Sequence, residues 1–338
     1  MILAIHALAH FLVDGLCVST LFSAGLDGKA LSAAVILYNS VAFSTQCLVG
    51  LWLDRRGHWL RYDAGAMLLV VLGFLLPIPA LLRVCLCAAG NSVFHVAAGA
   101  MTLSAGRGRT RDLGIFVAPG AFGVTLATCF PGCGRYLLPA LLLCIAAACY
   151  VWPRTPATLE FRPELDQPAE RFPAGPVLLL TAAVAVRAIG GAAVQYAWKT
   201  GVTEAFLLTA FVFAGKLLGG WICDRLGPAK TGWISILPAA VCIALFSDFA
   251  VPALAGQFLL NLTMPVTLWL LYRALPGEPA FAFGLAASAL WPGTIAGLLL
   301  PVSGAAGSCC MTVSFAFGLF AILYAAKKLG LLKGAHKK

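Results

Sequence analysis

The first apolar segment of the sequence carries three ionisable side chains that could relay protons. His6, His10 and Asp14 follow one another at intervals of four residues, which places them along one side of a helix at steps of about 6 Å. Asp14 lies about 20 Å of helix from the N-terminus, near the middle of a membrane. We expect Asp14 to be either a proton-titrating functional group or half of a buried ion pair. His10 could assist it, and His6 is expected to be structural or solvated.

This row of side chains does not have the pattern of a metal centre. The three residues climb the helix one turn at a time, and no second cluster of His and Cys residues with ligand spacing completes them. We therefore expect no bound metal and no cofactor.

Three more ionisable side chains lie in later apolar segments. His95 is either a functional group or a hydrogen-bonded packing residue. Arg187 has a depth similar to that of Asp14, so it could pair with Asp14 or bind an anionic or zwitterionic ligand. Lys216 could contact the same ligand or support the charged motif that follows it.

That motif has the form G-x-x-x-D-R-x-G and occurs twice, with its aspartates 170 residues apart. Its fixed positions are Gly50, Asp54, Arg55 and Gly57 in the first copy, and Gly220, Asp224, Arg225 and Gly227 in the second. Asn91 and Asn261 show the same offset and are expected to line a cavity or to hydrogen-bond between helices. An aspartate at a helix end can accept hydrogen bonds from the first amides of a neighbouring helix and can pair with Arg. The repetition indicates a duplicated membrane fold.

Composition limits the class of protein. Hydrophobic residues make up 61% of the 338 residues and charged residues 11%, and the mean hydropathy is +0.93. A chain of this kind spans a lipid bilayer many times, so a soluble enzyme or a nucleic-acid-binding protein is excluded. Continuous apolar runs favour helices over a barrel. The sequence predicts an all-α protein with twelve spans, at residues 1–24, 31–53, 60–78, 81–104, 113–130, 136–152, 176–198, 204–222, 231–247, 250–272, 280–300 and 305–326.

The positive charges predict the orientation of these spans. With the N-terminus inside, seventeen Lys and Arg residues fall on the cytoplasmic side and four on the outer side, as in proteins of the cell or inner membrane. Both termini are then cytoplasmic, and the net charge of +10 is explained by topology. The first segment lacks a basic start, so no cleavable signal is expected. Whether Cys129 and Cys133 form a disulfide is left open.

A polar, proline-rich stretch divides the chain into two halves. Residues 153–175 contain five Pro, four acidic residues and three Arg, a composition typical of a linker. We expect a six-helix bundle over 1–152 and a second, pseudo-symmetric bundle over 176–338 that ends in a short basic tail.

Twelve spans, the division into six and six, and the paired motif together resemble the major facilitator superfamily. His10 and Asp14 in the first span, and the run from Gly90 to His95 in the fourth, are similar to the fosmidomycin-resistance-type branch, although Val96 replaces the Pro that follows its His. That resemblance implies that the paired motif closes the cytoplasmic side as a gate. It also implies that the first and seventh spans face each other across a substrate cavity.

The function expected from these features is secondary active transport of a small organic solute by alternating access, through proton-coupled efflux by a monomer. An importer of an organic anion or nutrient is the alternative, and a non-transporting membrane sensor is the third possibility. No G-x-S-x-G or H-E-x-x-H motif occurs, so an intramembrane enzyme is not expected.

Overall fold

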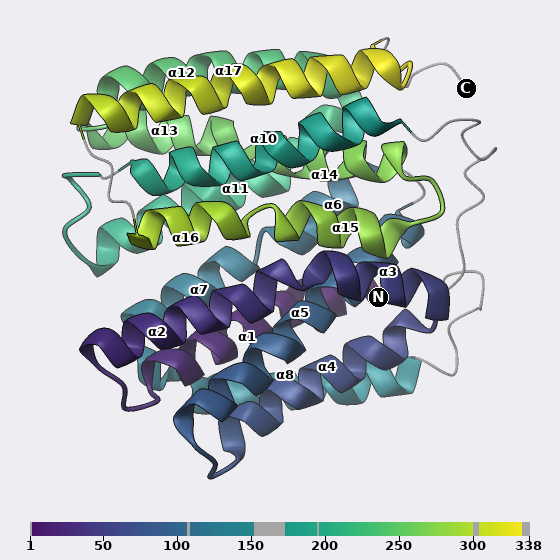
Figure 1. Ribbon diagram of the computed structural model, residues 1–338, viewed down its shortest axis with the longest axis vertical. Coiled ribbons are helices and arrows are strands. Elements are labelled where there is room, and N and C mark those ends of the chain that lie inside the picture. The colour runs from purple at the N-terminus through teal and green to yellow at the C-terminus, as the bar shows by residue number, and fades with distance from the viewer. Residues whose placement is uncertain (1, 107–108, 152–172, 195, 300–303, 333–338) are drawn as a thin grey trace. The chain divides into compact units, whose positions relative to one another are not determined.

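The computed structural model describes residues 2–106, 109–151, 173–194, 196–299 and 304–332 of the chain. These residues form helices and no β-strand, so the protein is all-α (Figure 1). The predicted linker at 153–175 lies outside the described residues except for its last three. The end of the predicted basic tail, 333–338, also lies outside them.

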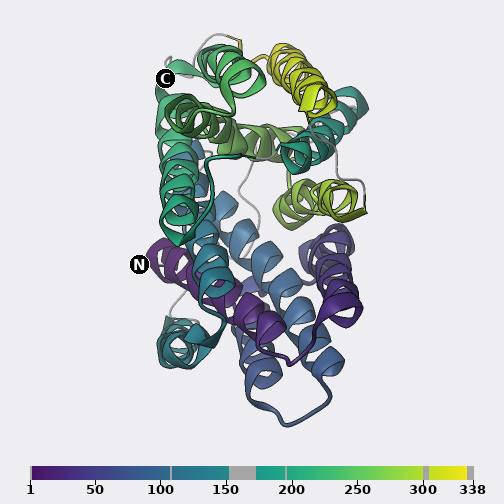
Figure 2. The ribbon, with the colours of Figure 1, turned by 90° about the vertical axis from the view of Figure 1, so that its left-hand side faces the viewer.

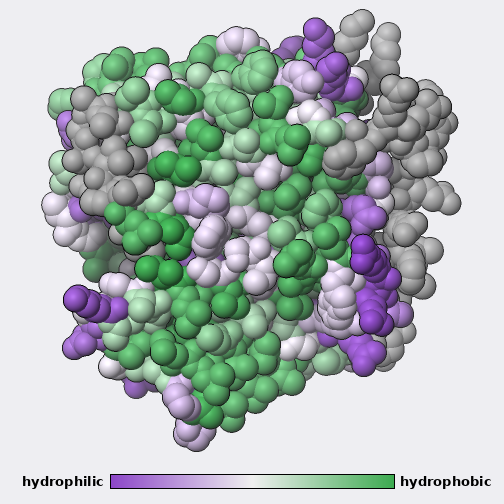
Figure 3. Space-filling model, in the orientation of Figure 1, coloured by the Kyte–Doolittle hydropathy of each residue, from purple (hydrophilic) through white to green (hydrophobic). Residues whose placement is uncertain are grey.

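The helices have the length and apolar character of membrane spans. Eleven helical segments of the described chain are long and apolar enough to cross a membrane. The helix that corresponds to the predicted third span, α4 (Trp59–Leu75), has 17 residues, which still fits a hydrocarbon core. Large apolar side chains such as Leu143, Leu178 and Val251 are exposed, and apolar residues dominate the face seen in Figure 3. The protein is a polytopic membrane protein.

The chain folds into two compact units. Unit 1 comprises residues 1–107, 116–165 and 277–288, and unit 2 comprises 108–115, 166–276 and 289–338. Each unit therefore takes one short helix from the opposite half of the sequence. The pair of bundles predicted at 1–152 and 176–338 remains a prediction.

Unit 1 is built around α1 and α5. Its helices are α1 (Ile2–Phe22), α2 (Gly28–Asn39), α3 (Gln46–Arg56), α4, α5 (Ala80–Ala105), α7 (Gly120–Cys129), α8 (Gly134–Val151) and α15 (Pro279–Ser288). Helix α1 packs against α7 and α8, and α5 packs closely against α4. At Gly90 a Cβ would lie 2.7 Å from the backbone oxygen of Ala66, so α4 and α5 approach this closely only because residue 90 is glycine.

Unit 2 has a similar all-helical construction. Its helices are α6 (Thr110–Val117, whose last two residues belong to unit 1), α10 (Ala174–Ala193), α11 (Val202–Leu226), α12 (Pro228–Phe246), α13 (Ala250–Asn261), α14 (Thr263–Ala274), α16 (Trp291–Leu299) and α17 (Gly304–Lys328). Helix α17 packs against α10 and α12, and α13 packs against α11 and α12. Figure 2 shows α12 and α17 as neighbours when the molecule is turned.

Several predicted spans are interrupted rather than continuous. The span predicted at 113–130 breaks between α6 and α7, where Pro119 lacks the N–H that would continue the helix. The span predicted at 280–300 breaks between α15 and α16, just before Pro292. The span at 250–272 breaks at Leu262, and the one at 31–53 contains a π-helical turn over Ser40–Ser44. Apolar length alone does not reveal such breaks, because each half of the span stays hydrophobic.

Candidate functional site

The first copy of the repeated motif caps a helix. Asp54 lies in the last turn of α3, and its Oδ1 accepts a hydrogen bond from the Ala280 amide at 3.0 Å. Its Oδ2 accepts one from the Phe281 amide at 2.7 Å. These amides open α15, where backbone N–H groups have no acceptor within their own helix. The carboxylate therefore satisfies two of them and faces the positive end of the α15 dipole.

The second copy repeats this contact within unit 2. Asp224 lies in the last turn of α11, and its two oxygens accept hydrogen bonds from the amides of Thr110, at 2.7 Å, and Arg111, at 3.1 Å. Those amides open α6. The two copies of one sequence pattern thus form the same structure, a carboxylate across the first turn of a short helix.

The motif glycines allow this approach. A Cβ at Gly50 would lie 2.5 Å from the Ala280 oxygen, and a Cβ at Gly220 would lie 2.5 Å from the Arg111 Cα. Gly57 and Gly227 end α3 and α11 with φ of 65° and 81°, in a region that residues with a side chain rarely adopt. The last glycine of each motif thus ends its helix just after the aspartate, and the first glycine lets the partner helices touch.

The basic residues of the motif do not pair with its aspartates in the part of the chain that the structure describes. Arg55 and Arg225 are exposed, and within the described part of the chain neither forms an ion pair with Asp54 or Asp224. Of the two contacts that the sequence offered for these aspartates, the structure shows the one with amides of a neighbouring helix, and backbone amides occupy both oxygens of each carboxylate.

Two neighbours strengthen the contact between α6 and α11. The Arg111 guanidinium lies 5.1 Å from the centre of the Trp221 ring, a cation–π distance. The Lys216 side chain is half-buried, and its backbone oxygen lies where a Cβ at Gly114 would collide at 2.6 Å. Lys216 thus lies at the contact between α6 and α11, and its role as a gate residue remains a prediction.

A second group of predicted residues meets inside unit 1. Helix α1 brings His10 and Asp14 to His95 and Asn91 of α5. The His10 Nε2 atom lies 3.2 Å from Asp14 Oδ2, and the His95 Nε2 atom lies 3.5 Å from Asp14 Oδ1. The Asn91 amide nitrogen donates to Asp14 Oδ1 at 3.0 Å. We call His10, Asp14, Asn91 and His95 the α1–α5 cluster.

Both histidines of the α1–α5 cluster are anchored to the backbone. His10 Nδ1 lies 2.8 Å from the Phe116 carbonyl oxygen, and His95 Nδ1 lies 2.9 Å from that of Asn91. A carbonyl oxygen can only accept, so each Nδ1 carries the hydrogen. The His10 ring also contacts the Phe116 ring, with 4.8 Å between centroids. Rotation of either imidazole would break one of these bonds, so both Nε2 atoms are held toward Asp14.

His6 does not join the α1–α5 cluster. It is buried one turn before His10 on α1, with Nε2 3.3 Å from a carboxylate oxygen of Asp63 on α4. This buried pair fits the structural role expected for His6. It also means that the three residues spaced by four along α1 serve two different neighbours.

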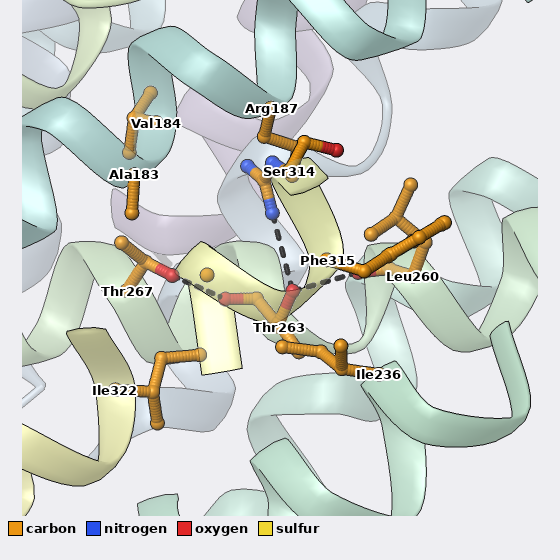
Figure 4. A pocket seen from close by; sticks show the side chains of 11 residues that line it. Ala183, Val184, Arg187, Ile236, Leu260, Thr263, Thr267, Ser314, Phe315 and Ile322 are labelled. Carbon is orange, nitrogen blue, oxygen red and sulfur yellow. Dashed lines mark hydrogen bonds between the residues drawn. The ribbon is translucent and has the colours of Figure 1, made fainter. Parts of the chain in front are cut away.

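Unit 2 contains the other predicted intramembrane residues. The Arg187 guanidinium on α10 donates to Thr263 Oγ1 at 3.1 Å and lines a small pocket with Thr267 and Ser314 (Figure 4). Thr267 and Ser314 donate to backbone oxygens of their own helices, and Thr263 donates to the Leu260 oxygen of α13. The three hydroxyls therefore offer lone pairs to the pocket, while Arg187 offers N–H donors. The pairing predicted between Arg187 and Asp14 remains a prediction.

Asn261, at the end of α13, has a different environment from Asn91. Its side-chain nitrogen donates to the backbone oxygen of Gln257 at 2.8 Å, and Gln257 in turn donates to the Tyr196 hydroxyl. The matching positions of the two asparagines in the sequence repeat therefore do not give matching contacts.

Comparison with solved structures assigns the fold. The chain aligns with FucP, a major facilitator superfamily transporter in the outward conformation, with a TM-score of 0.67 and 13% identity over 95% of this chain and 98% of that one. The chain has the fold of the major facilitator superfamily. A second structure, of the E. coli fucose:proton symporter FucP, aligns with a TM-score of 0.63 and 13% identity, over 96% and 98% of the two chains.

A third solved structure is also similar. It is a bacterial homologue of the iron transporter ferroportin in an outward-facing state, with a TM-score of 0.61 and 15% identity over 97% of this chain and 98% of that one. No protein-family model matches the sequence, and no curated protein matches it. The closer resemblance to the fosmidomycin-resistance-type branch remains a prediction.

Two parts of the site were not identified from the sequence. Helix-opening amides were expected as partners of the aspartates, but not those of α6 and α15, because every residue except proline has an N–H. Gly120, the first residue of α7, lies so close to the α1–α5 cluster that a Cβ there would collide with Asp14 Oδ2 and His10 Nε2. Its signal in the sequence is the Pro119-Gly120 pair inside an apolar run, which marks a helix break beside the cluster.

The close contact of α3 with α15 predicts a stability difference between two glycine variants. In Gly50→Ala the new methyl meets backbone atoms of α15, and overpacking of this kind costs about 1–3 kcal/mol. Gly65→Ala is the matched control, because a Cβ on α4 at that position meets nothing within 4 Å. We expect a lower unfolding midpoint in detergent for Gly50→Ala alone. Equal midpoints for the two variants would contradict the contact.

Proposed function

We propose that the protein is a secondary active transporter that moves a small organic solute by alternating access. The observation that carries this proposal is the pair of carboxylate caps at Asp54 and Asp224. Each cap consists of two hydrogen bonds to helix-opening amides, an interaction of about 0.5–2 kcal/mol. Such a contact can hold one arrangement and break within a transport cycle. The repeated motif is then the cytoplasmic gate, with Gly50, Gly57, Gly220, Gly227 and Lys216 supporting it.

The α1–α5 cluster supplies the coupling site in this proposal. Asp14 is a carboxylate surrounded by apolar helices, and its side chain is 14% exposed. It carries the proton during exchange, and His10 and His95 assist. One protein of the same fold is described as a fucose:proton symporter, so the fold is compatible with proton coupling.

The Arg187 pocket supports an anionic or zwitterionic solute. No carboxylate is among the residues that line it, so the guanidinium charge remains available to a ligand. We further propose that the protein works as a monomer and that its membrane is the cell's inner membrane. Both termini would be cytoplasmic, with the halves 1–152 and 176–338 joined by the linker 153–175.

The direction of transport divides two versions of this proposal. Efflux is the first version. Import of an organic anion or nutrient is the second, favoured by the symporter described for a similar structure. A panel of carboxylates, sugars and amino acids is first screened for compounds that raise the unfolding temperature of the purified protein. Proteoliposomes then receive a compound from the screen and an imposed pH gradient. We expect the compound to move against the proton flux, and movement with the protons would establish import.

The capping contacts predict that transport and ligand binding can be separated. Asp54→Ala removes one cap, and a loss of about 1–2 kcal/mol corresponds to a 5–30-fold change in a conformational equilibrium. We expect the transport rate to fall by up to that factor while the thermal shift caused by the same compound is kept. Asp27→Ala is the control, because Asp27 precedes α2, is exposed and makes no side-chain cap. Equal loss of binding and transport in Asp54→Ala would instead place Asp54 in the substrate site.

The position of Asp14 predicts a loss of coupling. Asp14→Asn keeps the size of the side chain and removes its charge, so uphill transport driven by a pH gradient should disappear while expression is retained. The measurement is accumulation of the compound in proteoliposomes with and without the gradient, together with the yield of folded protein. A variant that still pumps uphill would remove Asp14 from the coupling role.

A further inference from the structure

The two histidines of the α1–α5 cluster present acceptor atoms to each other. Both Nδ1 atoms donate to carbonyl oxygens, so the Nε2 atom of each neutral ring carries a lone pair. The two Nε2 atoms lie 2.8 Å apart. Two lone pairs at this distance repel each other, so the arrangement is favourable only with a positive species between or beside them.

The third side chain completes a set of ligands. The contacts between ligand atoms are 2.8 Å between the Nε2 atoms, 3.2 Å from His10 to Asp14 and 3.5 Å from His95 to Asp14. All three atoms lie within 4.8 Å of one another. Neighbouring ligands on one ion with bonds of about 2.1 Å are about 3–3.5 Å apart. The two contacts of Asp14, one through each carboxylate oxygen, thus have the spacing of a coordination shell, and the two Nε2 atoms lie slightly closer together than that spacing.

The surroundings match those of a metal ligand set. A ligating histidine usually donates its other nitrogen to a carbonyl or carboxylate, which fixes the ring, and both rings do so here. Asn91 is 1% exposed and donates to Asp14, while its own Oδ1 accepts no hydrogen bond from the described residues. An acceptor left in this way next to Asp14 favours a cation or its bound water.

The glycine at position 120 leaves the ligand atoms uncovered. A methyl group there would collide with both Asp14 Oδ2 and His10 Nε2, so any residue larger than glycine would press on two of the three ligands. Asp14 is also the most exposed of the three, at 14% against 7% for His10 and 11% for His95.

We propose that His10, His95 and Asp14 bind a divalent first-row transition metal ion, such as Zn²⁺ or Co²⁺. Two imidazoles and one carboxylate suit these ions, whereas Ca²⁺ and Mg²⁺ prefer oxygen ligands alone. Three protein ligands leave coordination positions that water or a carboxylate of an organic solute fills. The proposal that a metal ion binds here does not depend on transport. Any statement about what the protein carries rests on the proposed function. The proposal departs from the expectation from the sequence that these side chains bind no metal.

The test is metal binding by the purified full-length chain in detergent. After treatment with a chelator, the protein is dialysed against Zn²⁺ and the bound metal is counted, and Co²⁺ is titrated in parallel by absorption. We expect one tight equivalent at the site and a Co²⁺ spectrum without thiolate charge-transfer bands. That spectrum separates the site from the twelve free cysteines, since thiolates are the competing soft ligands.

Four variants locate the ion. His95→Gln and Asp14→Asn each remove a ligand and should weaken the tight equivalent by more than about 100-fold, because even outer partners change affinity 10–100-fold. Gly120→Ala removes no ligand and should weaken it through collision alone. Asn91→Ala should lower the affinity for Zn²⁺ by a smaller factor, because Asn91 hydrogen-bonds a ligand and does not itself bind the ion.

Two controls and one transport measurement make the outcome decisive. His6→Gln and Gly65→Ala should keep the tight equivalent, because His6 binds Asp63 and Gly65 faces open space. The inference fails if wild-type protein binds no Zn²⁺ tightly, which would leave only a shared proton. It also fails if binding survives both His95→Gln and Gly120→Ala. If the protein binds Zn²⁺ tightly but moves no solute under a pH gradient, the metal site is supported and the proposed transport function is contradicted.

Discussion

The structure depends on a carboxylate that accepts hydrogen bonds from the opening amides of another helix. The contact is made once by Asp54 on α15 and once by Asp224 on α6. Opening amides buried without an acceptor cost about 1–3 kcal/mol each. The four motif glycines serve this contact: two of them end a helix, and the other two allow the partner helices to approach. The contact is one of those that join the short helices α6 and α15 to their units.

The ionisable groups of unit 1 follow a related constraint. A charge within apolar helices is stable only where neighbours compensate it. Asp63 meets this requirement with His6, and Asp14 meets it with two imidazoles and an amide. The backbone carbonyls that fix the two imidazoles are on α5 and α6, so the tautomers depend on the packing of helices and not on the cluster alone.

The sequence was sufficient for the membrane class, the helical fold and the residues worth attention, because apolar length and intramembrane charge are local properties. It was not sufficient for the contacts. His95 and His10 are 85 residues apart, and nothing in either segment states which helix face meets the other. The partners of Asp54 are backbone amides, which have no residue identity to find. The sequence offered two kinds of partner for Asp54, an arginine and the amides of a neighbouring helix, and the structure uses the amides.

The cap on α15 also sets an order of assembly. Asp54 and its partner amides are 226 and 227 residues apart in the chain. At about 5–20 residues per second, the ribosome makes α15 roughly 10–50 s after α3. During that interval the end of α3 is in the membrane without its partner helix, next to an apolar chain that is still growing. Asp224 has no such delay, because α6 is already made when α11 appears. Of two identical contacts, one can therefore form during synthesis as soon as its aspartate is made, while the other must wait until the last spans are translated.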